Sequence, residues 1–170
     1  YDGDEVKLEE SGAIDEDEDK MRTYLGNGTL YVRYAKSGTR WFGSIFSKSL
    51  TLYLPEKYAS ALDRITLNAV SADVKTEGEI VCRELKFEGV SGKISMPSLS
   101  CDTVDIDTVS GNVTISGWIG KLDVDAVSAN VTLNLSGAPR NVDMSTVSGR
   151  VDMTIPENCG FSADLDSVSG

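Results

Sequence analysis

A short motif recurs along this 170-residue chain at nearly constant spacing. Each copy reads Val-Ser and then Gly or Ala, and in the full copies a branched aliphatic residue follows two positions later. Successive motif valines lie 20, 19, 18, 20 and 21 residues apart, a period typical of solenoids built from stacked repeats. The motif valines are Val70, Val90, Val109, Val127, Val147 and Val168.

The hydrophobic pattern changes parity at each motif. With the motif valine as position 0, positions −5 and −3 are apolar in every copy, and positions +4 and +6 are apolar in nearly every full copy. Period-two alternation is typical of a strand with one buried face. The change of parity indicates a corner between −1 and +2, where a small residue fits. The sequence predicts an all-β fold, a parallel β-solenoid (β-helix) with coils of about 20 residues, wound right-handed by the crossover rule.

A serine follows the motif valine in every copy. A nucleophile is the functional interpretation, but the chain contains no histidine and no Gly-x-Ser-x-Gly elbow surrounds these serines. A ladder of hydroxyl groups that bond to the backbone of the corner explains all the copies at once. We therefore favour a structural role, and no catalytic residue is predicted.

Composition narrows the possible ligands. The formal net charge is −11, from 27 acidic and 16 basic residues, which argues against nucleic acid as a partner. The absence of histidine removes most zinc sites, and no cofactor is expected. The three cysteines form no Cys-x-x-Cys pair. Cys82 and Cys101 fall on adjacent coils, so a disulfide is open to them, although we favour an inward ladder of thiols. No apolar run reaches the length of a membrane span.

Acidic residues collect on the outward positions −4 and −2. Eight of these twelve residues are acids and one, Lys86, is a base. Stacked carboxylates about 4.8 Å apart repel one another, so some of their pKa values should be raised. One interpretation is that these columns of acids keep the β-solenoid soluble. The other is that they bind basic peptides or, weakly, divalent cations. The candidate partner-binding residues are Glu88, Asp105, Asp107, Asp123, Asp125, Asp143, Asp164 and Asp166.

The N-terminal part lacks the repeat. We expect strands at residues 5–9, 29–34 and 50–54, forming irregular coils that cap the solenoid, and a solvated acidic loop at 15–19. The apolar stretch holding Trp41, Phe42, Ile45 and Phe46 is either a lid on the first coil or a loop that touches a partner or membrane surface. We expect one continuous domain, with a cap at 1–48 and solenoid repeats at 49–170. It ends in mid-motif, so we also expect self-association through an exposed end coil.

The repeats carry a family resemblance. The VSGxV motifs with outward Asp at −4 and −2 resemble a bacterial β-strand-repeat family catalogued as an adhesin-like domain of unknown function. They are also similar to the toastrack-type β-solenoids of envelope-stress proteins in Gram-positive bacteria. The resemblance covers residues 49–170, including LTLYLPEKY (50–58) and IPENCGF (155–161), and only loosely covers 1–48. It implies a parallel β-solenoid, a binding or sensing role at the cell envelope and no catalytic residues.

These observations favour a non-enzymatic module that binds an unknown protein, peptide or envelope component and functions in adhesion or stress sensing. A rigid spacer or assembly scaffold is the alternative. A carbohydrate-active β-helix enzyme is disfavoured, because an active site would interrupt the repeat with a unique acid and base, whereas the acids here are regular. We expect the envelope or extracellular side of a Gram-positive bacterium, and the cytoplasm stays open because the flanking sequences are missing.

Overall fold

The computed structural model describes residues 2–12, 20–33, 48–157, 159–160 and 163–169. The chain forms two compact units, Tyr1–Glu56 and Lys57–Gly170. The expected acidic loop at 15–19 and the apolar stretch with Trp41, Phe42, Ile45 and Phe46 lie outside the described residues.

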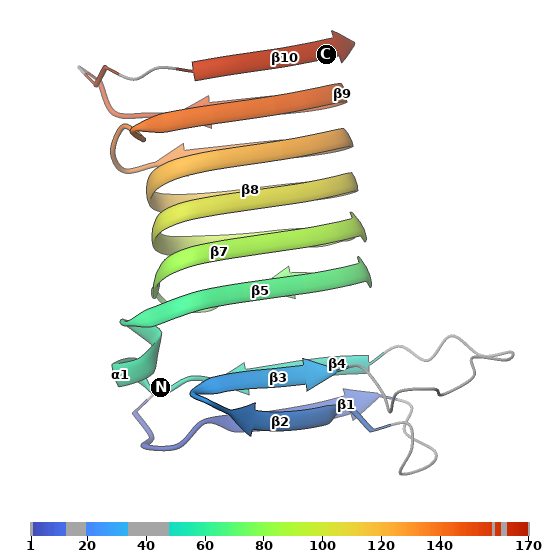
Figure 1. Ribbon diagram of the computed structural model, residues 1–170, viewed down its shortest axis with the longest axis vertical. Coiled ribbons are helices and arrows are strands. Elements are labelled where there is room, and N and C mark those ends of the chain that lie inside the picture. The colour runs from blue at the N-terminus through green and yellow to red at the C-terminus, as the bar shows by residue number, and fades with distance from the viewer. Residues whose placement is uncertain (1, 13–19, 34–47, 158, 161–162, 170) are drawn as a thin grey trace, which may run out of the picture. The chain divides into compact units, whose positions relative to one another are not determined.

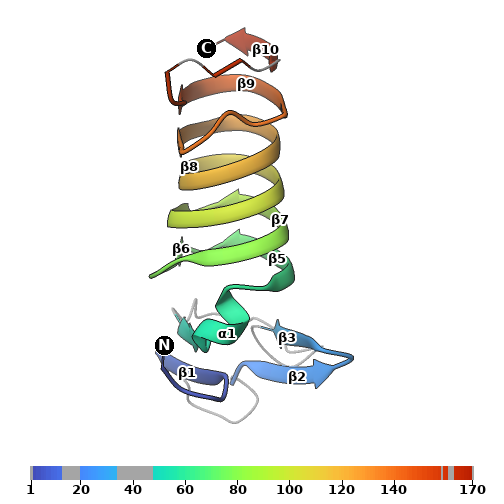
Figure 2. The same ribbon diagram turned by 90° about the vertical axis from the view of Figure 1, so that its left-hand side faces the viewer.

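The second unit is a parallel β-solenoid (Figure 1). Its strands stack in the order β10-β9-β8-β7-β5, and β6 also pairs with β8. The longest, β8, continues through 43 residues and winds around several coils (Figure 2). The all-β solenoid predicted from the repeat is therefore confirmed. The strands are β5 (Leu62–Ser71), β6 (Val74–Lys75), β7 (Ile80–Ser91), β8 (Lys93–Leu135), β9 (Asn141–Thr154) and β10 (Ala163–Ser169).

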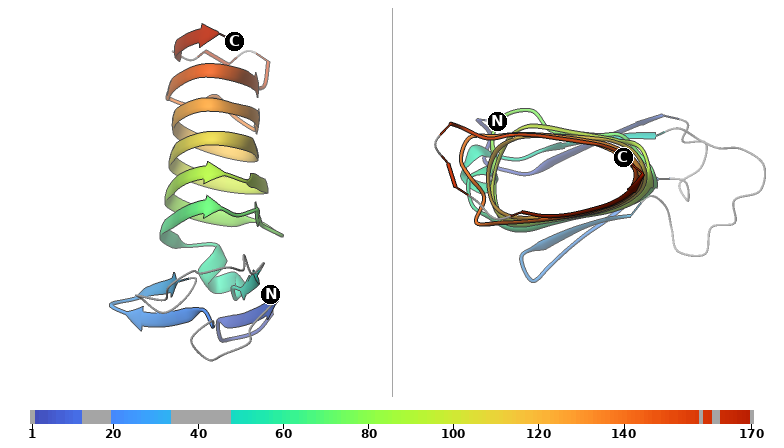
Figure 3. Two further views of the ribbon diagram at one scale, coloured as in Figure 1. Left: turned by 90° about the vertical axis from the view of Figure 1, so that its right-hand side faces the viewer. Right: turned by 90° about the horizontal axis from the view of Figure 1, so that it is seen from above.

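Strand register fixes the length of a coil. Leu62 pairs with Cys82 and Cys82 with Cys101, steps of 20 and 19 residues, and Lys121 pairs with Asn141 after another 20. Each motif position therefore lies beside the same position of the next coil. Seen from above, the coils of this unit superpose in a flattened oval (Figure 3).

The core lies inside the coils and follows the predicted parity. Positions −5 and −3 of the central coils are buried, and beyond the corner positions +4 and +6 are buried as well. The apolar residues of the first and last coils are less buried and pack against this core. Buried examples are Leu85, Val104, Leu122 and Val142 before the corner, and Ile94, Val113, Ile115, Val131 and Leu133 after it.

The corner requires glycine in three of the coils. Gly92, Gly111 and Gly149 have φ of +139°, +128° and +137°, in the region that L side chains avoid. A Cβ added to Gly111 would lie 2.1 Å from the carbonyl oxygen of Gly92 in the coil before it. Glycine at +2 is thus needed in these three coils both for the backbone conformation and for the close stacking, whereas Ala72 and Ala129 hold the same position without a positive φ.

The motif serines link neighbouring corners. Each of three hydroxyls donates a hydrogen bond to the carbonyl oxygen of the motif valine in the preceding coil. These bonds confirm the predicted hydroxyl ladder for the coils that contain them. They are Ser91 to Val70 at 3.3 Å, Ser110 to Val90 at 3.1 Å and Ser148 to Val127 at 3.4 Å.

Cys82 and Cys101 form the thiol ladder that the sequence favours. Both are buried and free, and the two Sγ atoms lie 3.2 Å apart in paired positions of β7 and β8. Cys82 donates to Cys101, and Cys101 donates to the carbonyl oxygen of Thr103 at 3.1 Å. The hydrogen bond to Cys101, with burial, raises the pKa of the Cys82 thiol.

The first unit is antiparallel, so its strands are not further coils of the solenoid. β1 (Lys7–Gly12) pairs with β4 (Lys48–Tyr53), and β2 (Arg22–Gly26) forms a hairpin with β3 (Thr29–Arg33). Asn27 and Gly28 close the hairpin with φ of +53° and +75°, as in the type I′ turn that favours tight antiparallel pairing. β2 was not predicted from the sequence, and β4, expected as part of an irregular capping coil, pairs antiparallel with β1 instead. That this unit caps the solenoid stays a prediction.

The chain continues into β5 through a single short helix in its described part, α1 (Glu56–Ala59). No helix among the described residues has the length and apolar character needed to cross a membrane.

Candidate partner-binding face

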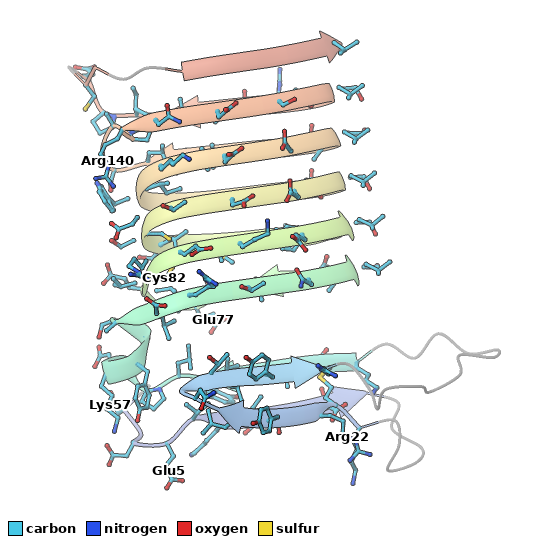
Figure 4. The ribbon with its side chains drawn as sticks, viewed as in Figure 1. Glu5, Arg22, Lys57, Glu77, Cys82 and Arg140 are labelled. Carbon is cyan, nitrogen blue, oxygen red and sulfur yellow. The ribbon has the colours of Figure 1, made fainter. Side chains whose placement is uncertain are left out.

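The acidic columns lie side by side on the strands that precede each corner. Because the strands are parallel and in register, outward side chains of successive coils stack in columns (Figure 4). Lys86 pairs with Asp105, Glu88 with Asp107 and Asp123 with Asp143. The backbone register also places Asp164 beside Asp143 and Asp166 beside Ser145. The structure therefore brings Glu88, Asp105, Asp107, Asp123, Asp125 and Asp143 together on one surface, which we call the acidic face.

Lys86 occupies the centre of one part of this face. Its Nζ lies 3.1 Å from Asp105, 3.2 Å from Glu88 and 3.6 Å from Asp107, on its own and the next coil. Hydrogen bonds to Asp105 and Glu88 raise the pKa of the Lys86 ammonium. One lysine thus compensates three carboxylates, and the spacing of the repeat alone did not predict this arrangement.

The carboxylates of the following coils have no such cation. Within the described part of the chain, Asp123, Asp125 and Asp143 form no ion pair within 4.0 Å. Partial burial raises the pKa of Asp123, and repulsion from Asp143, Asp105 and Asp125 raises it further, with Lys121 opposing. The expectation of a raised carboxylate pKa is confirmed at this residue. We call Asp123, Asp125 and Asp143 the uncompensated acids.

We expect the Asp123→Asn variant to be slightly more thermostable than the wild type at pH 7. A raised pKa means that the folded state binds the proton more tightly than the unfolded chain does, so wild-type stability falls as pH rises through that pKa. The gain should shrink as pH falls and vanish below the ordinary value of 3.8, where Asp123 is protonated in both states. Thermal unfolding of the wild type and the variant, from pH 7 to below pH 3.8, measures this difference in stability.

Asp152→Asn is the control for that measurement. Asp152 lies on the other outward face with its carboxylate 3.8 Å from Arg150, so removing its charge should bring no gain at pH 7. An equal gain in both variants would show that net charge, rather than repulsion on the acidic face, sets the effect.

A groove runs along the acidic face beside the corner, with a volume of about 760 Å³. Three columns line it: a mainly acidic wall at position −2, a floor of small residues at −1, and a ridge of motif valines at 0. The wall is Asn68, Glu88, Asp107, Asp125 and Ser145. The floor is Ala69, Gly89, Thr108 and Ala126, and the ridge is Val70, Val90, Val109, Val127 and Val147.

The valine ridge is exposed, and it was not among the functional features predicted from the sequence. Val90, Val109, Val127 and Val147 keep 45–47% of their surface exposed, and Val70 keeps 75%. The signal was in the parity, because position 0 has the same parity as the outward positions −2 and −4. The repeat thus places an apolar column directly beside an acidic one.

Other features of the described surface offer less chemistry. Among the residues that the structure describes, no three His, Cys, Asp or Glu side chains are grouped so that they could hold a metal ion. A second depression, of about 370 Å³, lies over Cys82, Cys101 and Trp118. Arg83 and Asp63, which also line it, pair with each other at 2.7 Å.

The fold and its repeated corner define a β-solenoid repeat protein. The family model described as Toastrack DUF4097 matches residues 2–170, so the chain belongs to this family, whose members carry a domain of unknown function. The match also includes the N-terminal residues, where the sequence resemblance was loose. Comparison with curated proteins and with solved structures gives no match.

Proposed function

We propose that this chain is a non-enzymatic binding module of the bacterial cell envelope, and that it recognises cationic side chains of a protein or peptide partner on the acidic face. The observation that carries the proposal is the group of uncompensated acids, Asp123, Asp125 and Asp143. Burial and, after it, repulsion from neighbouring carboxylates raise the pKa of Asp123, and a cation bound between these acids would relieve that repulsion. Membership of the Toastrack DUF4097 family supports a β-solenoid without an assigned reaction.

Lys86 supplies an internal example of the proposed contact. Its ammonium group sits among carboxylates of two neighbouring coils at 3.1–3.6 Å. The next coils repeat the same outward positions with Asp123, Asp125 and Asp143 but without the lysine. A lysine or arginine of a partner would take the equivalent place there. Such a contact needs no metal.

The test is the binding of a fluorescein-labelled decalysine peptide, followed by fluorescence anisotropy at low and high salt. The triple variant Asp123→Asn, Asp125→Asn and Asp143→Asn should bind about tenfold more weakly than the wild type. Added salt should weaken wild-type binding, because these charges are accessible to solvent.

A second triple variant controls for net charge. Glu77→Gln, Asp152→Asn and Glu157→Gln remove the same charge from exposed positions away from the acidic face. This variant should keep nearly wild-type affinity. If both triple variants lose affinity equally, attraction is a property of net charge alone and the proposed site is wrong. If the wild type binds no decalysine, a rigid spacer becomes the better interpretation.

The location proposed for the module has its own test. Purified wild-type protein should co-sediment with Gram-positive envelopes in low salt, and the first triple variant should remain in the supernatant. Equal recovery of both proteins in the pellet would contradict a role for the acidic face in envelope binding.

A further inference from the structure

The valine ridge is not explained by the recognition of cations. Isolated exposed apolar side chains are ordinary, whereas a contiguous apolar stripe bordered by polar residues is typical of an interaction surface. Val90, Val109, Val127 and Val147 form such a stripe, with the mainly acidic wall across the groove. An occupant of this groove therefore needs an apolar side and a basic side.

The dimensions of the groove select an extended chain. Positions −2 and 0 of a strand are about 6.6–6.8 Å apart, which sets the width of the groove between wall and ridge. An α-helix with its side chains is about 10–12 Å across, so it is too wide for this groove. The first and fifth valines, four coil spacings of about 4.8 Å apart, lie about 19 Å from each other along the stack. Six residues in the polyproline II conformation, at about 3.1 Å each, cover this length.

The repeat of the ridge favours polyproline II over a β-strand. In polyproline II every third side chain points the same way, about 9.3 Å apart, which is close to the 9.6 Å of two coil spacings. In a β-strand the side chains on one face recur every 6.6–6.8 Å and lose register with the coils after one step. A polyproline II segment can therefore keep one column of side chains on the valines along the whole groove.

Charge distinguishes such a segment from a second copy of this chain. A second copy has the same coil spacing, but its net charge is also −11. An antiparallel pair joined along the ridges would place one acidic wall against the other. On the wall, Lys86 already compensates Glu88 and Asp107, whereas Asp125 has no ion pair among the described residues and complements a lysine or arginine of a partner.

From these observations we infer that the groove binds a basic polyproline II segment, with aliphatic side chains at every third position against the valine ridge and lysine or arginine side chains toward the acidic wall. The inference rests on the proposed function and adds the conformation and apolar character of the partner. The floor residues Ala69, Gly89 and Ala126 are small enough for the partner backbone to approach closely.

The test uses a fluorescein-labelled peptide of four Val-Lys-Pro repeats. The wild type should bind it about tenfold more tightly than four Ser-Lys-Pro repeats, because the valines bury additional apolar surface. The double variant Val109→Thr and Val127→Thr keeps the shape and β-branching of the ridge but adds hydroxyls. It should bind both peptides with the lower affinity, and its thermal unfolding should confirm that it is folded.

The outcomes separate this inference from the proposed function. If the threonine variant binds Val-Lys-Pro repeats as tightly as the wild type, the ridge is not the contact and the inference is overturned, while decalysine binding that depends on the uncompensated acids still supports the proposed function. If an alternating Val-Lys peptide of equal length binds as tightly, the polyproline II assignment is wrong. If the wild type sediments as a dimer and the threonine variant as a monomer, the ridge binds a second copy of this chain and the inferred peptide partner is wrong.

Discussion

Replacing Gly111 by alanine is expected to destabilise the solenoid by about 3 kcal/mol, among the largest effects of any single methyl group in this chain. Two costs combine at this corner. The φ of +128° is strained for any residue with a Cβ, and the added atom would lie 2.1 Å from the carbonyl oxygen of Gly92. Since both atoms belong to stacked corners, relief requires a shift of the backbone. Urea unfolding followed by far-ultraviolet circular dichroism measures the loss.

Gly78→Ala separates the two costs. Gly78 also has a positive φ, +81°, but a Cβ added there meets nothing within 4 Å. Its replacement should therefore cost only the backbone strain, about 1 kcal/mol. Equal losses at Gly78 and Gly111 would show that close stacking of the corners contributes nothing to stability.

The Val124→Asp variant should lose more than about 4 kcal/mol, enough to unfold a domain of ordinary stability. Val124 is 1% exposed and lies among the core residues of the coils on either side. A carboxylate there has no partner, so it is either buried as a charge or protonated at a large cost. Circular dichroism at neutral pH should show loss of strand structure.

The neighbouring Asp125→Val variant provides the matched control. Asp125 is exposed, one step along the same strand, and its side chain points to the opposite face. Valine suits an exposed strand position, so stability should stay within about 0.5 kcal/mol of the wild type. If the two variants lose stability equally, the assignment of inward and outward positions in this coil is wrong.

The repeat was predictable because its physical causes are local and repeated. Alternation of apolar residues before Val109 indicates a strand, and the small residue at 111 indicates a corner. The change of parity after the corner indicates a second strand. Six copies of the same pattern average out the ambiguity of any one copy. Antiparallel pairing in the first unit was missed because each of those strands occurs only once, and their alternation alone does not distinguish a hairpin from a coil.

The candidate site was predicted in part for the same reason. Columns of acids follow directly from outward positions in a parallel stack, so the grouping of Asp105, Asp123 and Asp143 was foreseen. The contacts of the Lys86 side chain with two coils were not predicted. Lys86 compensates carboxylates on two coils because its long, flexible stem places the ammonium between them, which depends on a rotamer and not on spacing.

The sequence by itself determined the coil: its length, its corner and which residues face inward, since these depend on a period that the chain repeats. Tertiary structure alone decided what the outer surface offers. Stacking turned separate valines into a continuous ridge and set it beside an acidic wall. It also left Asp123 close to like charges while Lys86 compensated its neighbours. The parity of the sequence turns each motif valine outward, but the distances between coils set the electrostatic repulsion and join the exposed valines into one apolar stripe.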